Sequence, residues 1–146
     1  MPPRHPRHFR CLLPLFASLL LLTGCFPHRE QIIPAIEGTL VSGQAPVAGA
    51  RIHVLPSLSK GGCGPSRYTA VTDAAGRFTV RGANEIGMIL PLGDRINTWG
   101  VCIEDGGRLV EGFRAGNIGW PPHHIDMHCD LARVRGICEW SESAMR

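Results

Sequence analysis

The sequence is poor in the features on which several large classes of protein depend. Only 18% of its 146 residues are charged and 6% are aromatic, and its basic residues are scattered rather than clustered. Nucleic-acid binding requires clustered Lys and Arg against the phosphates, so we expect no nucleic-acid partner. No apolar run approaches the roughly 20 residues of a membrane-spanning helix. The chain is also too short for a barrel enzyme or a multidomain assembly.

Motifs that support catalysis are missing as well. There is no G-x-S-x-G nucleophile motif, and the glycine-rich segment 61–64 lacks the Lys and the helix of a phosphate-binding loop. Paired C-x-x-C spacings, which are typical of zinc ribbons and of thiol redox centres, do not occur. We therefore expect a protein that is not an enzyme, and a small hydrolase is the least favoured alternative.

The first 24 residues have the organisation of an export signal. Residues 1–10 carry three arginines and no acidic residue, and residues 11–22 (CLLPLFASLLLL) are almost entirely apolar. This run is too short to cross a hydrocarbon core of about 30 Å, as is typical of a cleaved signal peptide. Without these residues, twelve basic residues balance twelve acidic ones, so the net charge of +3 belongs to the signal.

The end of this segment, Leu22-Thr23-Gly24-Cys25, resembles the lipobox of bacterial lipoproteins. The resemblance implies cleavage before Cys25, acylation of that Cys, and attachment of the mature chain to a lipid bilayer. Phe26 stands where an Asp would resemble an inner-membrane retention signal. The resemblance therefore favours a cell-envelope protein anchored in the outer membrane and facing the periplasm. Residues 25–35 would be the lipidated Cys and a tether.

Beyond residue 35 the pattern is typical of strands. Short alternating apolar runs recur and are followed by Gly, Pro, Asn or Asp, whereas no 3.6-residue periodicity persists over three turns. Hairpins are expected at Asp73–Gly76 and Asp105–Gly107. Segment 82–93 also fits a helical turn or a loop. The alternation predicts strands at 36–42, 50–55, 68–72, 77–81, 88–92, 98–104, 108–114 and 124–132, with Phe78, Val80, Trp99, Val101 and Ile103 facing inward.

Three segments in order carry a second resemblance: Gly38–Val41 (GTLV), Ala45–Ile52 (APVAGARI) and Val71–Val80 (VTDAAGRFTV). They are similar to the carboxypeptidase-regulatory-like, or transthyretin-like, β-sandwich, and the likeness covers residues 36–81. It implies an all-β fold, a single small antiparallel or mixed β-sandwich of seven to eight strands at 36–135, with a tail at 136–146. Domains of this family are mostly non-catalytic modules, but a fold alone does not establish a function.

Once Cys11 is removed with the signal and Cys25 is acylated, four cysteines remain. An even number in an exported domain predicts two disulfides, for which three pairings are possible. The chain can turn back after 133–136, so a bond between Cys129 and Cys138 would fasten the tail to the sheet. The expected pairs are Cys63–Cys102 and Cys129–Cys138.

The last predicted strand has a polar stripe rich in histidine. With a period of two, one face carries Ile125, Met127, Cys129 and Leu131, and the other carries His124, Asp126, His128 and Asp130. Neighbours on one face lie about 6.5 Å apart, so His124, Asp126 and His128 could share a zinc or copper ion, helped by His123 or His53. Any half-exposed strand shows the same alternation, so a solvent-exposed face with no cofactor is the simpler interpretation.

Trp120 lies in Gly119-Trp120-Pro121-Pro122, where the prolines stiffen the loop. A rigid exposed Trp could anchor an envelope protein or a glycan, or it could cover the end of the domain. The leading hypothesis is a membrane-anchored, non-catalytic binding or structural module of the envelope. The alternative is a metal-binding lipoprotein that uses the histidine-rich strand.

Overall fold

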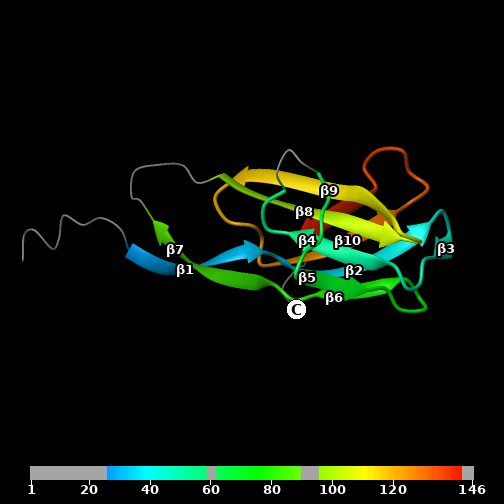
Figure 1. Cartoon of the computed structure of the whole chain (residues 1–146), viewed down its shortest axis with the longest axis horizontal. Coiled ribbons are helices and arrows are strands. Elements are labelled where there is room, and N and C mark those ends of the chain that lie inside the picture. Colours follow the sequence, from blue (N-terminus) through cyan, green and yellow to red (C-terminus); the bar gives the residue numbers. More distant parts are fainter. Residues whose placement is uncertain (1–25, 59–61, 90–95, 143–146) are drawn as a thin grey trace, which may run out of the picture. The chain divides into compact units, whose positions relative to one another are not determined.

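The computed structural model describes residues 26–58, 62–89 and 96–142, and every regular element in these ranges is a strand (Figure 1). The all-β prediction is confirmed at this level. Within the described part of the chain, no helix has the length and apolar character needed to cross a bilayer. The predicted signal and Cys25 lie outside the described residues.

Each predicted strand has a counterpart in the structure, and three further strands are present. The strand predicted at 88–92 lies earlier in the structure, and residues 90–92 are outside the described ranges. The strands are β1 (Phe26–Ile33), β2 (Ala35–Ser42), β3 (Ala45–Pro46), β4 (Arg51–Leu55), β5 (Tyr68–Val71), β6 (Arg77–Val80), β7 (Ala83–Ile89), β8 (Ile96–Asp105), β9 (Arg108–Ile118), β10 (His124–Asp130) and β11 (Cys138–Glu142).

Three sheets contain these strands. One is an antiparallel sheet in the order β5-β4-β8-β9. The second is mixed and has the order β11-β10-β2-β3, with β6 also paired to β2. Within it β2 and β10 run parallel, and the other pairs are antiparallel. The third consists of β1 and β7.

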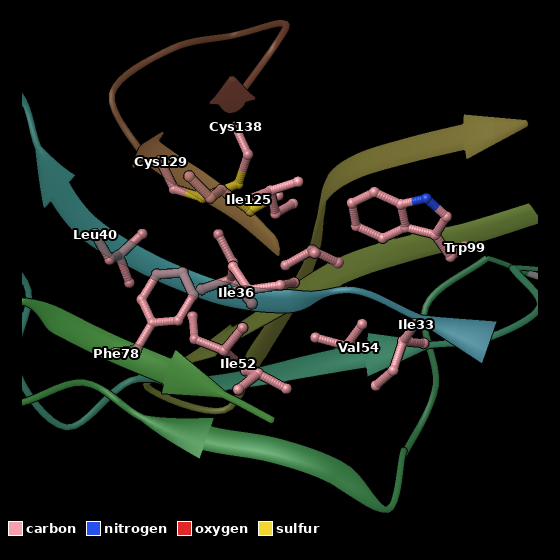
Figure 2. Packing of buried hydrophobic residues seen from close by; sticks show 14 of the residues in the cluster. Ile33, Ile36, Leu40, Ile52, Val54, Phe78, Trp99, Ile125, Cys129 and Cys138 are labelled. Carbon is pink, nitrogen blue, oxygen red and sulfur yellow. A yellow bond between two sulfur atoms is a disulfide. The ribbon is translucent and has the colours of Figure 1, made fainter. Parts of the chain in front are cut away.

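The inward side chains of the two larger sheets form one core (Figure 2). Alternation places Ile36 and Leu40 of β2 on the inner face, and both are fully buried. Figure 2 shows Ile52 and Val54 from the other sheet in the same cluster. Trp99 is 1% exposed, and its ring centroid lies 5.0 Å from that of Phe113. The predicted inward positions of β6 and β8 are all buried, so the alternation in the sequence located the core correctly.

Two glycines are required by close contacts around β2. A Cβ added to Gly38 would lie 2.3 Å from Cζ of Phe78 and 2.9 Å from the carbonyl oxygen of Met127. Gly76 has a φ of +72°, and its Cβ would lie 2.3 Å from the carbonyl oxygen of Leu40. It lies in the turn at Asp73–Gly76, where the predicted hairpin is wrong, because β5 pairs with β4 and β6 pairs with β2, so this turn joins two sheets. Glycine at these positions therefore lets β6 and β10 approach β2 closely.

Both expected disulfides are present, so the prediction of this pairing is confirmed. Cys129 and Cys138 are direct partners in the β10–β11 register and are bonded to each other. The bond between Cys63 and Cys102 fastens the segment after β4 to β8. Leu58, in that segment, is only 4% exposed.

The chain divides into two compact units, residues 1–28 with 86–93, and residues 29–85 with 94–146. A tether was expected over 25–35, but Phe26–Ile33 forms β1 and Ile33 is fully buried. The expected tail at 136–146 contains β11, which begins at Cys138 and pairs with β10. In the structure, ordered strands therefore extend beyond both ends of the predicted domain.

Candidate functional site

Eight side chains form a polar grid on the side of the mixed sheet that faces away from the core. In one row, Glu37 of β2 pairs with Thr79 and with Asp126, and Asp126 pairs with Ser141. The next row lies two residues along each strand, so its members face the same side. It runs Arg77, Thr39, His128 and Glu139. We call these eight residues the polar face.

The polar face is a shallow concavity of about 650 Å³, open to solvent. All eight residues line it, together with four residues of the same strands, Gly38, Phe78, Met127 and Trp140. Four strands from three separate parts of the sequence therefore contribute to one accessible surface.

Arginines form ion pairs at the edges of this surface but not at its centre. Arg77 contacts Asp73, with 3.0 Å between Nε and Oδ2, and Arg133 forms an ion pair with Glu139. Among the described residues, no Lys or Arg forms an ion pair with Glu37 or Asp126. These two carboxylates are register partners across the parallel strands β2 and β10.

A group suited to a metal ion lies at this point. Glu37, His124 and Asp126 each have a possible ligand atom, and the three atoms lie within 4.8 Å of one another. His124 Nε2 is 3.9 Å from Glu37 Oε1, and both side chains are substantially exposed. The group therefore contains two of the three residues predicted from the sequence. Its third member, Glu37, was missed because strand spacing cannot reveal which residue of a distant parallel strand lies alongside.

His128, the third predicted ligand, lies in the next row and is not a member of this group. Its Nδ1 is 2.8 Å from the Thr39 hydroxyl, its partner across the strands. A hydroxyl beside an imidazole is also the first requirement for nucleophilic catalysis. The second requirement is a third group that orients the imidazole. Among the described residues, the side chain seen to hydrogen-bond the His128 ring is Thr39 itself, which would be the nucleophile and not this third group.

The two suggested helper histidines do not join the group either. His123 is exposed just before β10, and its carbonyl accepts a hydrogen bond from the Ala35 amide. His53 is on β4, in the other sheet, where it is 7% exposed and its Nε2 lies 3.1 Å from Glu104 Oε2. His53 is therefore a buried residue of the other sheet that contacts Glu104.

Asp130, the last residue of the predicted polar stripe, has a structural contact. Its Oδ1 accepts hydrogen bonds from the amides of Gly43, at 2.8 Å, and Ala132, at 2.9 Å. These bonds, that of Gly43 first, hold the pKa of Asp130 below its ordinary value. The carboxylate thus joins the β2–β3 turn to the end of β10.

Trp120 is 47% exposed and precedes Pro121, which is buried. It is not among the residues that line the polar face. Its predicted role as an anchor for a partner stays a prediction.

Comparison with known proteins adds no relative: no family model matches the chain, and no curated protein matches it significantly.

Proposed function

We propose that this chain is a lipoprotein of the bacterial cell envelope, anchored through acylated Cys25, with a non-catalytic domain that binds an envelope partner. The signal-like segment and the lipobox at Leu22–Cys25 support the anchor. The position of the motif directly before β1 supports it further, because the folded part then starts at the membrane. The outer membrane, on its periplasmic side, is the proposed location.

We also propose that the domain is a transthyretin-like sandwich. Its support is the order of the three similar segments along β2, β3 to β4, and β5 to β6. The turn at Asp73–Gly76 leads into β6, whose Phe78 is in the core, as the resemblance implies. The shared core of the two larger sheets is what a sandwich requires.

The polar face is the proposed binding surface of the domain. The observation that supports it is the eight-residue grid, which is concave, accessible and built from four strands. Hydroxyl, carboxylate and imidazole groups at fixed spacing give hydrogen-bonding specificity for a protein or a glycan.

Acylation is tested by labelling the full chain with palmitate in a Gram-negative bacterium. Label is expected in the membrane fraction and should be lost in Cys25→Ala. The matched control is Cys11→Ala, which changes a Cys inside the signal and should keep the label. Label that survives in Cys25→Ala, or no label in the unchanged chain, would overturn the proposed anchor.

Partner binding is tested with a photoreactive residue placed at Thr79 or Ser141 of the polar face. A discrete adduct with an envelope component is expected from these positions. The same probe at Thr69, which is exposed on β5 of the other sheet, is the control. Equal adducts from Thr69 and from the polar face would show that this surface has no specific role.

A second candidate function, binding of a divalent transition metal, is favoured by one specific observation. Glu37 and Asp126 are register partners that form no ion pair with Lys or Arg in the described chain, and His124 completes the group. Imidazole with carboxylates is a ligand set for zinc and copper. Because all three ligands are on an open face, the remaining coordination positions would be filled by water or by a bound molecule.

Titration of the full chain with zinc and with copper, in separate experiments followed by calorimetry, tests this function. His124→Ala and Glu37→Gln should each abolish stoichiometric binding, whereas His128→Ala should preserve it. Loss of binding in both His124→Ala and His128→Ala, with binding preserved in Glu37→Gln, would favour the group expected from the sequence. Unchanged affinity in all three variants would exclude a metal site on this face.

A further inference from the structure

Two exposed apolar side chains lie in the compact unit that contains the N-terminal end of the described chain. The described residues of this unit are Phe26–His28 and Ile86–Ile89, which belong to the paired strands β1 and β7. We call these seven residues the anchor-proximal ribbon. Ile86 is 82% exposed and Met88 is 59% exposed.

Ile86 and Met88 are separated by one residue of β7, so both point to the same side of the strand. Covering these two side chains with an apolar phase would remove their apolar surface from water, which is favourable. The ribbon also contains no acidic residue. It could therefore approach anionic lipid headgroups without the cost of repulsion or of desolvating a carboxylate.

The position of the ribbon in the sequence indicates what covers this face. Phe26 directly follows Cys25, and three residues of extended chain reach at most about 10 Å. The N-terminal end of a ribbon that begins directly after an acylated Cys is therefore held within about 10 Å of the headgroups, so the bilayer is the surface nearest to it.

We propose that the anchor-proximal ribbon lies on the lipid bilayer, with Ile86 and Met88 inserted among the headgroups. This inference rests on the acylation of Cys25 proposed above. It adds a second membrane contact to the lipid anchor. The ribbon thereby limits rotation of the chain about a single point of attachment.

Photo-crosslinking in a Gram-negative bacterium whose phospholipids carry labelled phosphate tests the inference. A benzophenone amino acid replaces Ile86, Met88 or Val134 in three separate full-length chains. Val134 is the control, because it is 95% exposed and belongs to the other unit. Phosphate-labelled adducts are expected at positions 86 and 88, and none is expected at position 134. The acyl groups on Cys25 contain no phosphate, so they do not produce this signal.

Palmitate labelling of the same samples separates this inference from the proposed anchor. An acylated chain without phospholipid adducts at 86 and 88, or with protein adducts only, would overturn the membrane contact and leave the anchor intact. An unacylated chain would overturn the anchor. Phospholipid adducts at 86 and 88 in such a chain would still support the contact, and their absence would overturn it too.

Discussion

Gly38 shows how much of the structure around β2 depends on a single missing side chain. The Phe78 ring and the Met127 carbonyl occupy the space where a Cβ would lie. Phe78 belongs to β6 and Met127 to β10, and β2 pairs with both strands. The absence of one methyl group therefore lets two neighbouring strands pack closely against β2, the strand that carries Glu37.

Gly38→Ala should lower the free energy of unfolding by about 1–3 kcal/mol, because the added methyl group overpacks the contact with Phe78. Urea denaturation followed by circular dichroism measures the change. Gly64→Ala is the control, since its Cβ would meet no atom within 4 Å and its φ is not left-handed. In the double variant Gly38→Ala/Phe78→Leu, the shorter side chain at position 78 leaves room for the methyl group and should recover part of the loss. An equal loss in Gly64→Ala would contradict the explanation.

The carboxylate of Asp130 should make stability depend on pH. Its pKa is held below the ordinary 3.8, so its contribution is present above pH 3.8 and is lost as the pH falls through the lower folded-state value. Asp130→Asn should melt at a lower temperature than the unchanged chain at pH 7. That difference should shrink in acid, where both side chains are neutral.

Thermal melts of Asp130→Asn between pH 7 and pH 2 give the comparison. Asp105→Asn, at an exposed position in the β8–β9 turn, is the control and should change the melting temperature little. A difference that is the same at every pH would show that the charge of Asp130 contributes nothing.

At the scale of elements, the sequence predicted the faces of the strands better than their partners. Alternation correctly separated Ile125 and Met127 from His124 and Asp126, because burial of one face imposes a period of two. The same alternation contains no information on which strands pair. That is why Glu37 was missed and why His128 was expected in the metal group. The two disulfides were predictable because few cysteines remained and turns limited their reach.

The two disulfides should stabilise the chain unequally. The bonded residues are separated by 39 positions in Cys63–Cys102 and by 9 in Cys129–Cys138. From the entropy of loop closure, Cys63→Ala/Cys102→Ala should lose about 4 kcal/mol and Cys129→Ala/Cys138→Ala about 3 kcal/mol. Urea titrations of both double variants measure these losses. A larger loss for the shorter loop would contradict the entropic explanation.

For the whole molecule, the C-terminal strands are part of the fold and not an appendage. β10 lies between β11 and β2, and it supplies Ile125, Met127 and Cys129 to the core. The resemblance to a known sandwich covered residues 36–81 and could not show this arrangement. The parallel pairing of β2 with β10 depends on contacts between distant segments, which local sequence does not encode.

A chain that stops after Ile118 should therefore lack a cooperative unfolding transition, since the core loses the strand that covers β2. A chain that stops after Glu142 keeps β10 and β11 and is the control, with a melting temperature close to that of the full chain. Circular dichroism melts and limited proteolysis distinguish the two. Cooperative melting of the shorter chain would show that β10 is dispensable.

The parallel pairing of β2 with β10 also affects the order in which the strands can pair during folding. Thr39 and its partner His128 are 89 positions apart, so β10 becomes available to β2 only after the intervening strands have entered the compartment in which the chain folds. β6 reaches one edge of β2 early, but the other edge keeps unpaired amide and carbonyl groups that another chain could join. The arrival of the last quarter of the chain, and not the closure of any hairpin, decides when that exposure ends.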